Sequence, residues 1–430
     1  MRFIRKRLAL ISEAPCAYSG SASRLFQKRP ALILEGHALL LMLVFLMGKM
    51  SALSAQDRMW QQLAASPYRL DTADVRALRI ELESISFFRD NEYSSPLADG
   101  YSLPGLWVQP KLTYMPLRQI KVGLGLQALI FNGANRYPNY VYHDIALWKG
   151  AQYSRGAHVL PWFRAQADFR RLSIVLGNIY GGQNHGLIEP LFNPETNLSQ
   201  DPEMGLQLLW DRPHLHADIW LNWQSYIFRE DTHQEAFTVG TTWRTMFNAQ
   251  DAPLHWYMPV QLVAQHRGGE QNTENRAVQT IYNGSIGAGM QWNIGRRVVK
   301  NLRVEADALL SYQQTGQLWP FRSGAAGYVS ADIALWRFLD AGISYFVAPR
   351  HFVSLYGNHL YSTLSVKDEQ DRGKLQTAAA HVRFHHSFAR GYSLGAEVEA
   401  WQTRQSGRGD FNFSFGIYLR VSPEFLIKRF

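Results

Sequence analysis

Strict alternation of apolar and polar residues is the feature that most limits how this chain can fold. Between residues 411 and 421, Phe411, Phe413 and Phe415 occupy every second position, and Asn412 and Ser414 lie between them. The same pattern recurs in several other stretches, at 119–130, 159–168, 214–224, 302–311 and 391–402. Side chains of a β-strand alternate between two faces, whereas apolar residues of an amphipathic helix recur every three or four positions. The pattern therefore predicts an all-β fold.

Long strands of this kind occur in two protein classes, soluble β-sandwiches and transmembrane β-barrels. Sandwich strands usually hold about 5–6 residues, whereas a membrane-spanning strand needs about 9–11. The alternating stretches here are long, and their apolar face carries almost no charge, while the other face holds ionised residues of both signs. Tyrosines and tryptophans lie near the predicted strand ends, as they do at a lipid–water interface: Tyr114, Tyr180, Trp210, Tyr226, Trp256, Tyr312 and Trp336. We therefore predict a transmembrane antiparallel β-barrel.

The connections between the predicted strands alternate between long and short, which is typical of outer-membrane barrels. Counting 349–373 as one long loop with a short internal hairpin keeps this rhythm along the whole chain. The count is then about sixteen strands, an even number with both chain ends in the periplasm, and fourteen to eighteen are possible because sequence-based boundaries shift by several residues. The strands are expected near 79–88, 105–114, 119–131, 158–168, 172–180, 204–210, 214–226, 236–247, 256–266, 281–294, 301–312, 324–336, 339–348, 374–388, 391–402 and 410–421.

The first 55 residues have the plan of a signal peptide. A basic stretch precedes the apolar run 38–47, and small residues follow, so that cleavage is expected near Ser54 or Ala55. This leader contains eight basic and two acidic residues, and so carries +6 of the formal net charge of +9. The remaining 36 basic and 33 acidic residues leave a charge of only +3, which does not favour a nucleic-acid partner. The only cysteine, Cys16, leaves with the leader, so the mature chain has no disulfide or thiolate metal site.

The chain is thus divided into four parts. Residues 1–55 form the leader, 56–78 a periplasmic N-terminal segment with a short helix, 79–421 the barrel, and 422–430 a C-terminal periplasmic tail. We expect the mature protein in the outer membrane, with outer-membrane lipid around it.

With these features the chain resembles the porin-like outer-membrane barrels of Gram-negative bacteria. The resemblance is architectural, covers about 79–430, and rests on the alternating strands, the loop rhythm, the signal peptide and the terminal aromatic Phe430. Such barrels often end in Phe, so the resemblance implies that Phe430 is part of the signal read by the barrel-assembly machinery, a further partner. The resemblance also implies a water-filled lumen.

Ionisable side chains of both signs occupy the predicted inward face. Two interpretations remain open: these residues line a pore and select solutes, or they pair across neighbouring strands and stabilise the wall. The candidates are Arg164, Asp168, His216, Asp218, Arg303, Glu305, Asp307, His381, Arg383, His385, Glu397 and Glu399.

Two long loops add candidates of a different kind. The loop 181–203 carries Asn184, His185 and Glu189, and it forms a constriction inside the barrel, a metal or sugar site, or an ordered surface loop. The loop 132–157 is rich in aromatic residues suited to stacking against sugars: Tyr137, Tyr140, Tyr142 and Trp148.

The leading functional hypothesis is a porin-like channel for passive diffusion of small polar solutes. The first alternative is a surface-assembly protein that binds extracellular polysaccharide, or another surface glycan, on its long loops. The second is a barrel enzyme that acts at the outer rim. Because His381 and His385 stand alone, with no nucleophile or nucleotide-binding motif in the chain, we predict that the protein is not an enzyme and has no catalytic residues, metal or cofactor.

Overall fold

The structure is a computed structural model that describes residues 58–132, 155–226, 234–269 and 277–430. The predicted leader and the aromatic residues Tyr137, Tyr140, Tyr142 and Trp148 lie outside these ranges, so the interpretations placed on them stay predictions. The described residues form one antiparallel sheet of seventeen strand segments. Their bounds are β1 (Ala77–Tyr93), β2 (Tyr101–Leu117), β3 (Ile120–Asn132), β4 (Arg155–Phe169), β5 (Leu172–Asn178), β6 (Met204–Arg212), β7 (Leu215–Ser225), β8 (Ala236–Met246), β9 (Leu254–Arg267), β10 (Gln279–Asn293), β11 (Val299–Thr315), β12 (Ser323–Leu335), β13 (Leu339–Ala348), β14 (Leu375–Ala389), β15 (Tyr392–Gln405), β16 (Arg408–Val421) and β17 (Glu424–Arg429).

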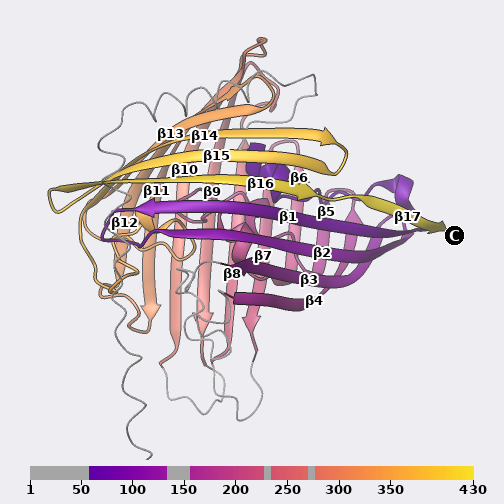
Figure 1. Cartoon of the computed structure of the whole chain (residues 1–430), viewed down its shortest axis with the longest axis horizontal. Helices are drawn as coiled ribbons and strands as arrows, with labels where there is room; N and C mark the ends of the chain where they lie inside the picture. Colours follow the sequence, from indigo (N-terminus) through magenta and orange to yellow (C-terminus); the bar gives the residue numbers. More distant parts are fainter. Residues whose placement is uncertain (1–57, 133–154, 227–233, 270–276) are drawn as a thin grey trace, which may run out of the picture. The chain divides into compact units, whose positions relative to one another are not determined.

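The sheet closes on itself because β1 pairs with strands from both ends of the chain. It pairs with β2 on one side and with β16 and β17 on the other, and in Figure 1 the yellow C-terminal strands lie beside the indigo β1. β16 and β17 follow each other along the same edge of β1 and together take the place of one strand of the barrel. The seventeen described segments therefore form a barrel of sixteen strands. The predicted all-β, antiparallel barrel of about sixteen strands is confirmed.

The last residues differ from the predicted tail 422–430. Pro423 has no backbone N–H and interrupts β16, but its carbonyl accepts a hydrogen bond from Leu82 N at 3.1 Å. Beyond it, Glu424–Arg429 form β17, which pairs with residues 77–81 of β1. The reason is that β1 begins at Ala77, two residues before the predicted start, and leaves an edge on which the chain end continues the sheet.

The two faces of the strands differ as the alternation predicts. On β16 the outward Phe411 and Ile417 are 57% and 54% exposed, whereas the inward Asn412 and Ser414 are fully buried. Removing apolar surface from water is favourable, so an outward face of this composition fits a hydrocarbon environment. Within the described ranges, no helix combines the length and the apolar character needed to cross a membrane.

Three segments lie inside the barrel, against inward-facing side chains: 58–70, 179–203 and 352–364. We call them the plug. The first contains α3 (Arg58–Leu63), whose Met59, Trp60 and Leu63 are buried with Tyr418 of the wall. The other short helices are η1 (Thr72–Asp74), η4 (Gly182–His185), α4 (Thr196–Ser199) and η5 (His359–Tyr361). The helix expected in the periplasmic segment 56–78 therefore exists, but it packs inside the barrel.

The remaining plug segments are also held by the inner wall. Asn283 Nδ2 of β10 donates to the carbonyl of Val353 at 2.7 Å, and Gln261 Nε2 of β9 donates to the carbonyl of Gly186 at 3.2 Å. The loop 349–373 contains an isolated bridge between Leu364 and Asp371, in agreement with the predicted internal hairpin. Of the alternatives for the loop 181–203, the structure shows the one in which the loop lies inside the barrel.

Candidate functional site

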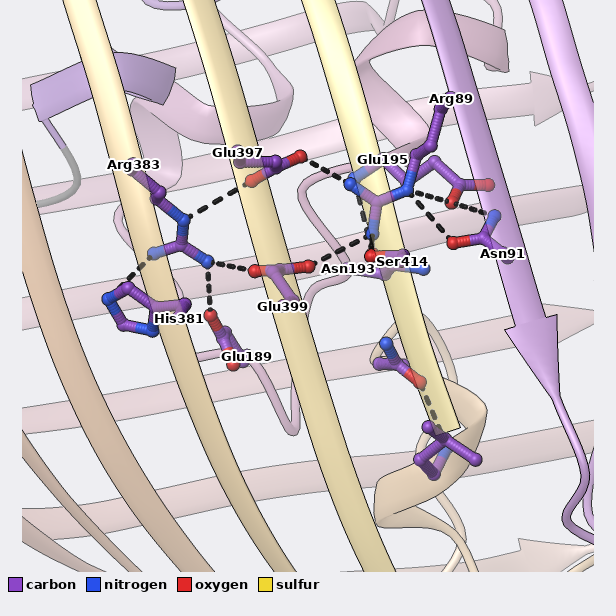
Figure 2. A network of polar contacts seen from close by, with 12 residues as sticks. Arg89, Asn91, Glu189, Asn193, Glu195, His381, Arg383, Glu397, Glu399 and Ser414 are labelled. Atoms are coloured by element: carbon purple, nitrogen blue, oxygen red, sulfur yellow. Dashed lines mark hydrogen bonds and ion pairs between the residues drawn. The ribbon is translucent and has the colours of Figure 1, made fainter. Parts of the chain in front are cut away.

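Two buried arginines organise the centre of the lumen. Arg89 of β1 contacts Glu399 of β15 at 2.9 Å and also contacts Glu397. Arg383 of β14 contacts the same two carboxylates, at 2.5 Å for Glu399 and 3.3 Å for Glu397. Each arginine then reaches one carboxylate of the plug, since Arg89 lies 2.7 Å from Glu195 and Arg383 lies 2.8 Å from Glu189 (Figure 2).

The strand register explains this arrangement. Glu397 and Glu399 are two positions apart on β15 and therefore point to the same face. Arg383 lies directly opposite Glu397 in the β14–β15 ladder. The alternating pattern thus places both carboxylates and one arginine side by side on the inner wall before any loop is added.

The network connects all three plug segments to the wall. Trp60 Nε1 of α3 donates to Glu397 at 3.1 Å, and Tyr361 OH donates to Glu189 at 3.2 Å. The side chain of Arg89 is 3% exposed, and those of Glu195 and Glu397 are fully buried. Removing one partner of a buried ion pair leaves an uncompensated charge and typically costs about 3–5 kcal/mol. The network therefore fixes the plug in the lumen.

His185 forms a second link between the plug and the wall. Its ring stacks on Trp220 with centroids 3.6 Å apart, and its Nδ1 and Nε2 lie 2.7 Å from Asp218 and 3.2 Å from Glu203. Burial alone would lower the pKa of His185, but the carboxylates of Glu203 and Asp218 raise it to about 9. A protonated ring that donates from both nitrogens cannot accept a proton or bind a metal. Among the described residues, no group of three or more His, Cys, Asp or Glu side chains is placed to hold a metal ion.

The other predicted inward residues lie on the inner face and contact the plug or the wall. Arg164 donates to the carbonyls of Asn178 and Ile179, and Asp168 accepts from Leu70 N at 3.1 Å. His216 contacts Asp211, and His385 contacts Asp340. Arg303 and His381 both contact Asp332. Glu305 accepts a hydrogen bond from Tyr257, and Asp307 is buried beside Glu305. Whether solutes pass along these residues stays a prediction. Of the loop candidates, Asn184 accepts from Ser66 N at 3.0 Å.

Arg89, the centre of the network, lies one residue beyond the strand predicted near 79–88 and was not among the candidates. The alternation could have predicted that Arg89 points inward, because Ile85 and Phe87 before it and Asn91 after it face the inside of the barrel. The partner Glu195 lies on a loop whose path through the lumen no local pattern predicts. Strand periodicity identifies inward charges but not which of them meet.

Two polar cavities lie between the plug and the inner wall of β1–β4. Their volumes are about 200 and about 100 Å³, and both are lined by Glu83, Lys111, Trp162 and Arg164. Lys111 lies 2.7 Å from Glu83, so these two lining charges compensate each other. The larger cavity reaches Arg390 and Glu424 at the end of the barrel that has short turns.

Comparison with known proteins gives a family. A family model described as lipid A 3'-O-deacylase-type matches residues 70–430, which include the whole barrel. No curated protein matches the chain.

Solved structures with a similar fold include the outer membrane protein OprD from Pseudomonas aeruginosa, which is 9% identical, with a TM-score of 0.42, over 85% of this chain and 99% of that chain. OmpT, an outer membrane protein of Vibrio cholerae, is 9% identical, with a TM-score of 0.43, over 81% of this chain and 100% of that chain. OccAB1 of Acinetobacter baumannii is 11% identical, with a TM-score of 0.40, over 82% and 98%. At this level of similarity these structures say nothing about the function of the chain.

The prediction that the protein is not an enzyme is wrong, because the matching family is described by an enzymatic activity, the deacylation of lipid A. The prediction failed because it required a sequence motif of a known catalytic type, and residues that meet only across strands form no such motif. The chain belongs to the lipid A 3'-O-deacylase-type family.

Proposed function

We propose that this protein is an outer-membrane hydrolase that removes an ester-linked acyl chain from lipid A. The observation that carries the proposal is the family match over residues 70–430, which takes in every strand of the barrel. The substrate is a membrane lipid, so the reaction belongs at the surface of the barrel that lipid can reach.

The position of the plug supports the same proposal. The centre of the barrel is occupied by buried ion pairs and by the apolar core of the plug, which includes Leu191, Phe352 and Leu360. An acyl chain cannot enter such a region without displacing them. The outward face, by contrast, is apolar and accessible along the whole barrel.

The test is the lipid A of a Gram-negative host that expresses the full chain. Lipid A is extracted and analysed by mass spectrometry, together with lipid A from cells that carry the empty vector. We expect a new species that lacks one acyl chain, with the corresponding free fatty acid in the lipid extract. Unchanged lipid A, both in cells and after incubation with the purified barrel in detergent, would overturn the proposal.

A passive channel for small polar solutes is the second candidate function. It is favoured by the two polar cavities that share Lys111, Trp162 and Arg164 and follow the inner wall of β1–β4. Planar-bilayer recordings of the purified protein test it, because a channel of this kind gives discrete ohmic steps. A barrel that inserts without conductance would exclude this candidate and leave the hydrolase proposal untouched.

A further inference from the structure

Four outward-facing residues form one row across adjacent strands near the rim of the barrel. The register pairs Trp223 of β7 with Phe237 of β8, Phe237 with His266 of β9, and His266 with Thr280 of β10. The aromatic rings follow each other closely, with centroids 5.2 Å apart for Trp223 and Phe237 and 5.0 Å apart for Phe237 and His266. The row therefore leads from two apolar rings to a histidine and a hydroxyl group.

Both ring nitrogens of His266 have a defined partner. Nε2 lies 2.9 Å from the carbonyl oxygen of Gly268, and Nδ1 lies 2.8 Å from Oγ1 of Thr280. A carbonyl oxygen can only accept, so Nε2 carries the proton, and Nδ1 is left to accept the hydrogen of the Thr280 hydroxyl. This is the order of nucleophile, base and orienting acceptor that activates a hydroxyl in many hydrolases.

Two glycines make the third member of this arrangement possible. Gly268 and Gly269 have φ values of +81° and +102°, a region that other residues rarely adopt. They fold the chain back at the end of β9 so that the Gly268 carbonyl meets the ring of its own strand. Gly268 N donates to the carbonyl of Glu235 at 2.9 Å, which fixes the turn.

The position of His266 fits a lipid substrate. Of the described histidines on strands, His158, His216, His255, His381 and His385 face inward, and His266 and His386 face outward. His386 lies near the short turn between β14 and β15, whereas His266 lies at the end of the barrel that has the long loops. Long loops are extracellular in outer-membrane barrels, and aromatic girdles mark the headgroup level. His266 and Thr280 thus lie where the ester groups of an outer-leaflet lipid are found.

We propose that Thr280 and His266 are the nucleophile and the base that cleave the ester, with Trp223 and Phe237 as the surface on which the acyl chain lies. The assignment rests on the proposed deacylase function. Thr280 Oγ1 bonds to the ester carbonyl carbon and passes its proton to Nδ1 of His266. The bond from that carbon to the sugar oxygen breaks, and the proton moves to this oxygen, which leaves as a hydroxyl. Water then attacks the acyl-threonine, gives a proton through His266 back to Oγ1, and releases the fatty acid.

The test compares variants of the full-length protein by the rate at which lipid A loses an acyl chain. Thr280→Val keeps the shape and removes the hydroxyl, and Thr280→Ser keeps the hydroxyl. We expect T280V and His266→Ala each to lower the rate by at least about a hundredfold, the usual contribution of such a group, and T280S to keep most of the activity. His386→Ala, the matched change at the other outward histidine, should leave the rate unchanged.

A second readout separates catalysis from folding. Each variant is checked for its heat-dependent shift in gel mobility, which reports a folded barrel, and the wild type is treated with a short-chain activated ester and analysed by mass spectrometry for an acyl group on Thr280. A folded T280V variant with wild-type activity would overturn this assignment while the deacylase function stood. Absence of activity in the wild type would instead refute the deacylase function itself.

Discussion

Replacing Arg89 by methionine removes the guanidinium group that joins three carboxylates of the lumen. Arg89 contacts Glu195, Glu397 and Glu399, and its side chain is 3% exposed, so water cannot compensate for the loss. Loss of one partner from a buried ion pair typically costs about 3–5 kcal/mol. Because each 1.4 kcal/mol is about tenfold in an equilibrium, the population with a displaced plug should rise by roughly two to four powers of ten.

Conductance and proteolysis both measure this population. Arg89→Met should give frequent current steps in planar bilayers and faster cleavage within 179–203, while the gel mobility of the barrel still reports a folded wall. Arg404→Met, on the outward face of β15, is the control and should behave as the wild type. Adding Glu195→Gln to Arg89→Met removes one of the uncompensated charges and should restore part of the plug stability. If R89M neither conducts nor exposes the loop, the network does not hold the plug in place.

Three further predictions follow from single side chains. The carboxylates beside His185 raise its pKa to about 9 in the folded protein. The contribution of His185 to the stability of the protein is therefore complete below about pH 6.5 and is lost as the pH rises through about 9. The melting temperature of the wild type should fall over this pH range, and that of His185→Phe should not. Gly240→Ala should lower the melting temperature, because its Cβ would lie 2.0 Å from the Trp220 ring and overpacking costs about 1–3 kcal/mol, whereas Gly327→Ala, with its nearest atom at 3.7 Å, should have little effect. Val398→Arg should destabilise the barrel in lipid vesicles by about 2–4 kcal/mol if its outward position faces the bilayer, as urea titration would measure, and no loss there would contradict a lipid-facing surface.

The strands were predictable because each carries its own pattern. The alternating series around Phe411 and Phe415 appears as the outward face of β16, and every other predicted strand has a counterpart near its expected position. This works because one buried face requires a period of two along the whole strand. The last predicted strand ended at residue 421, shortly before Pro423 breaks the alternation. The chain nevertheless continues to pair with β1 beyond Pro423, as β17.

The candidate sites were not predictable in the same way, because their members meet across the barrel. Arg89 and Glu195 are 106 positions apart in the sequence. The path of the loop 179–203, which carries Glu195, depends on the packing of the whole plug. His266 lay at the end of a predicted strand and Thr280 just before the next, so the alternation gave both an approximate place. Only the β9–β10 register, however, shows that the two side chains face each other.

The pairing of β1 with β16 and β17 has a consequence for the order in which this barrel is built. The first strand can pair on both edges only after the last strand has been made, because residues 77–93 pair on one side with residues 408–429. α3 precedes β1 and packs against inward residues of β15 and β16, such as Gly395 and Tyr418. Gly395 and Tyr418 belong to strands near the C-terminal end, so the wall against which α3 packs exists only once these strands have been made. The packing of the N-terminal helix and the closure of the barrel thus depend on the same part of the chain.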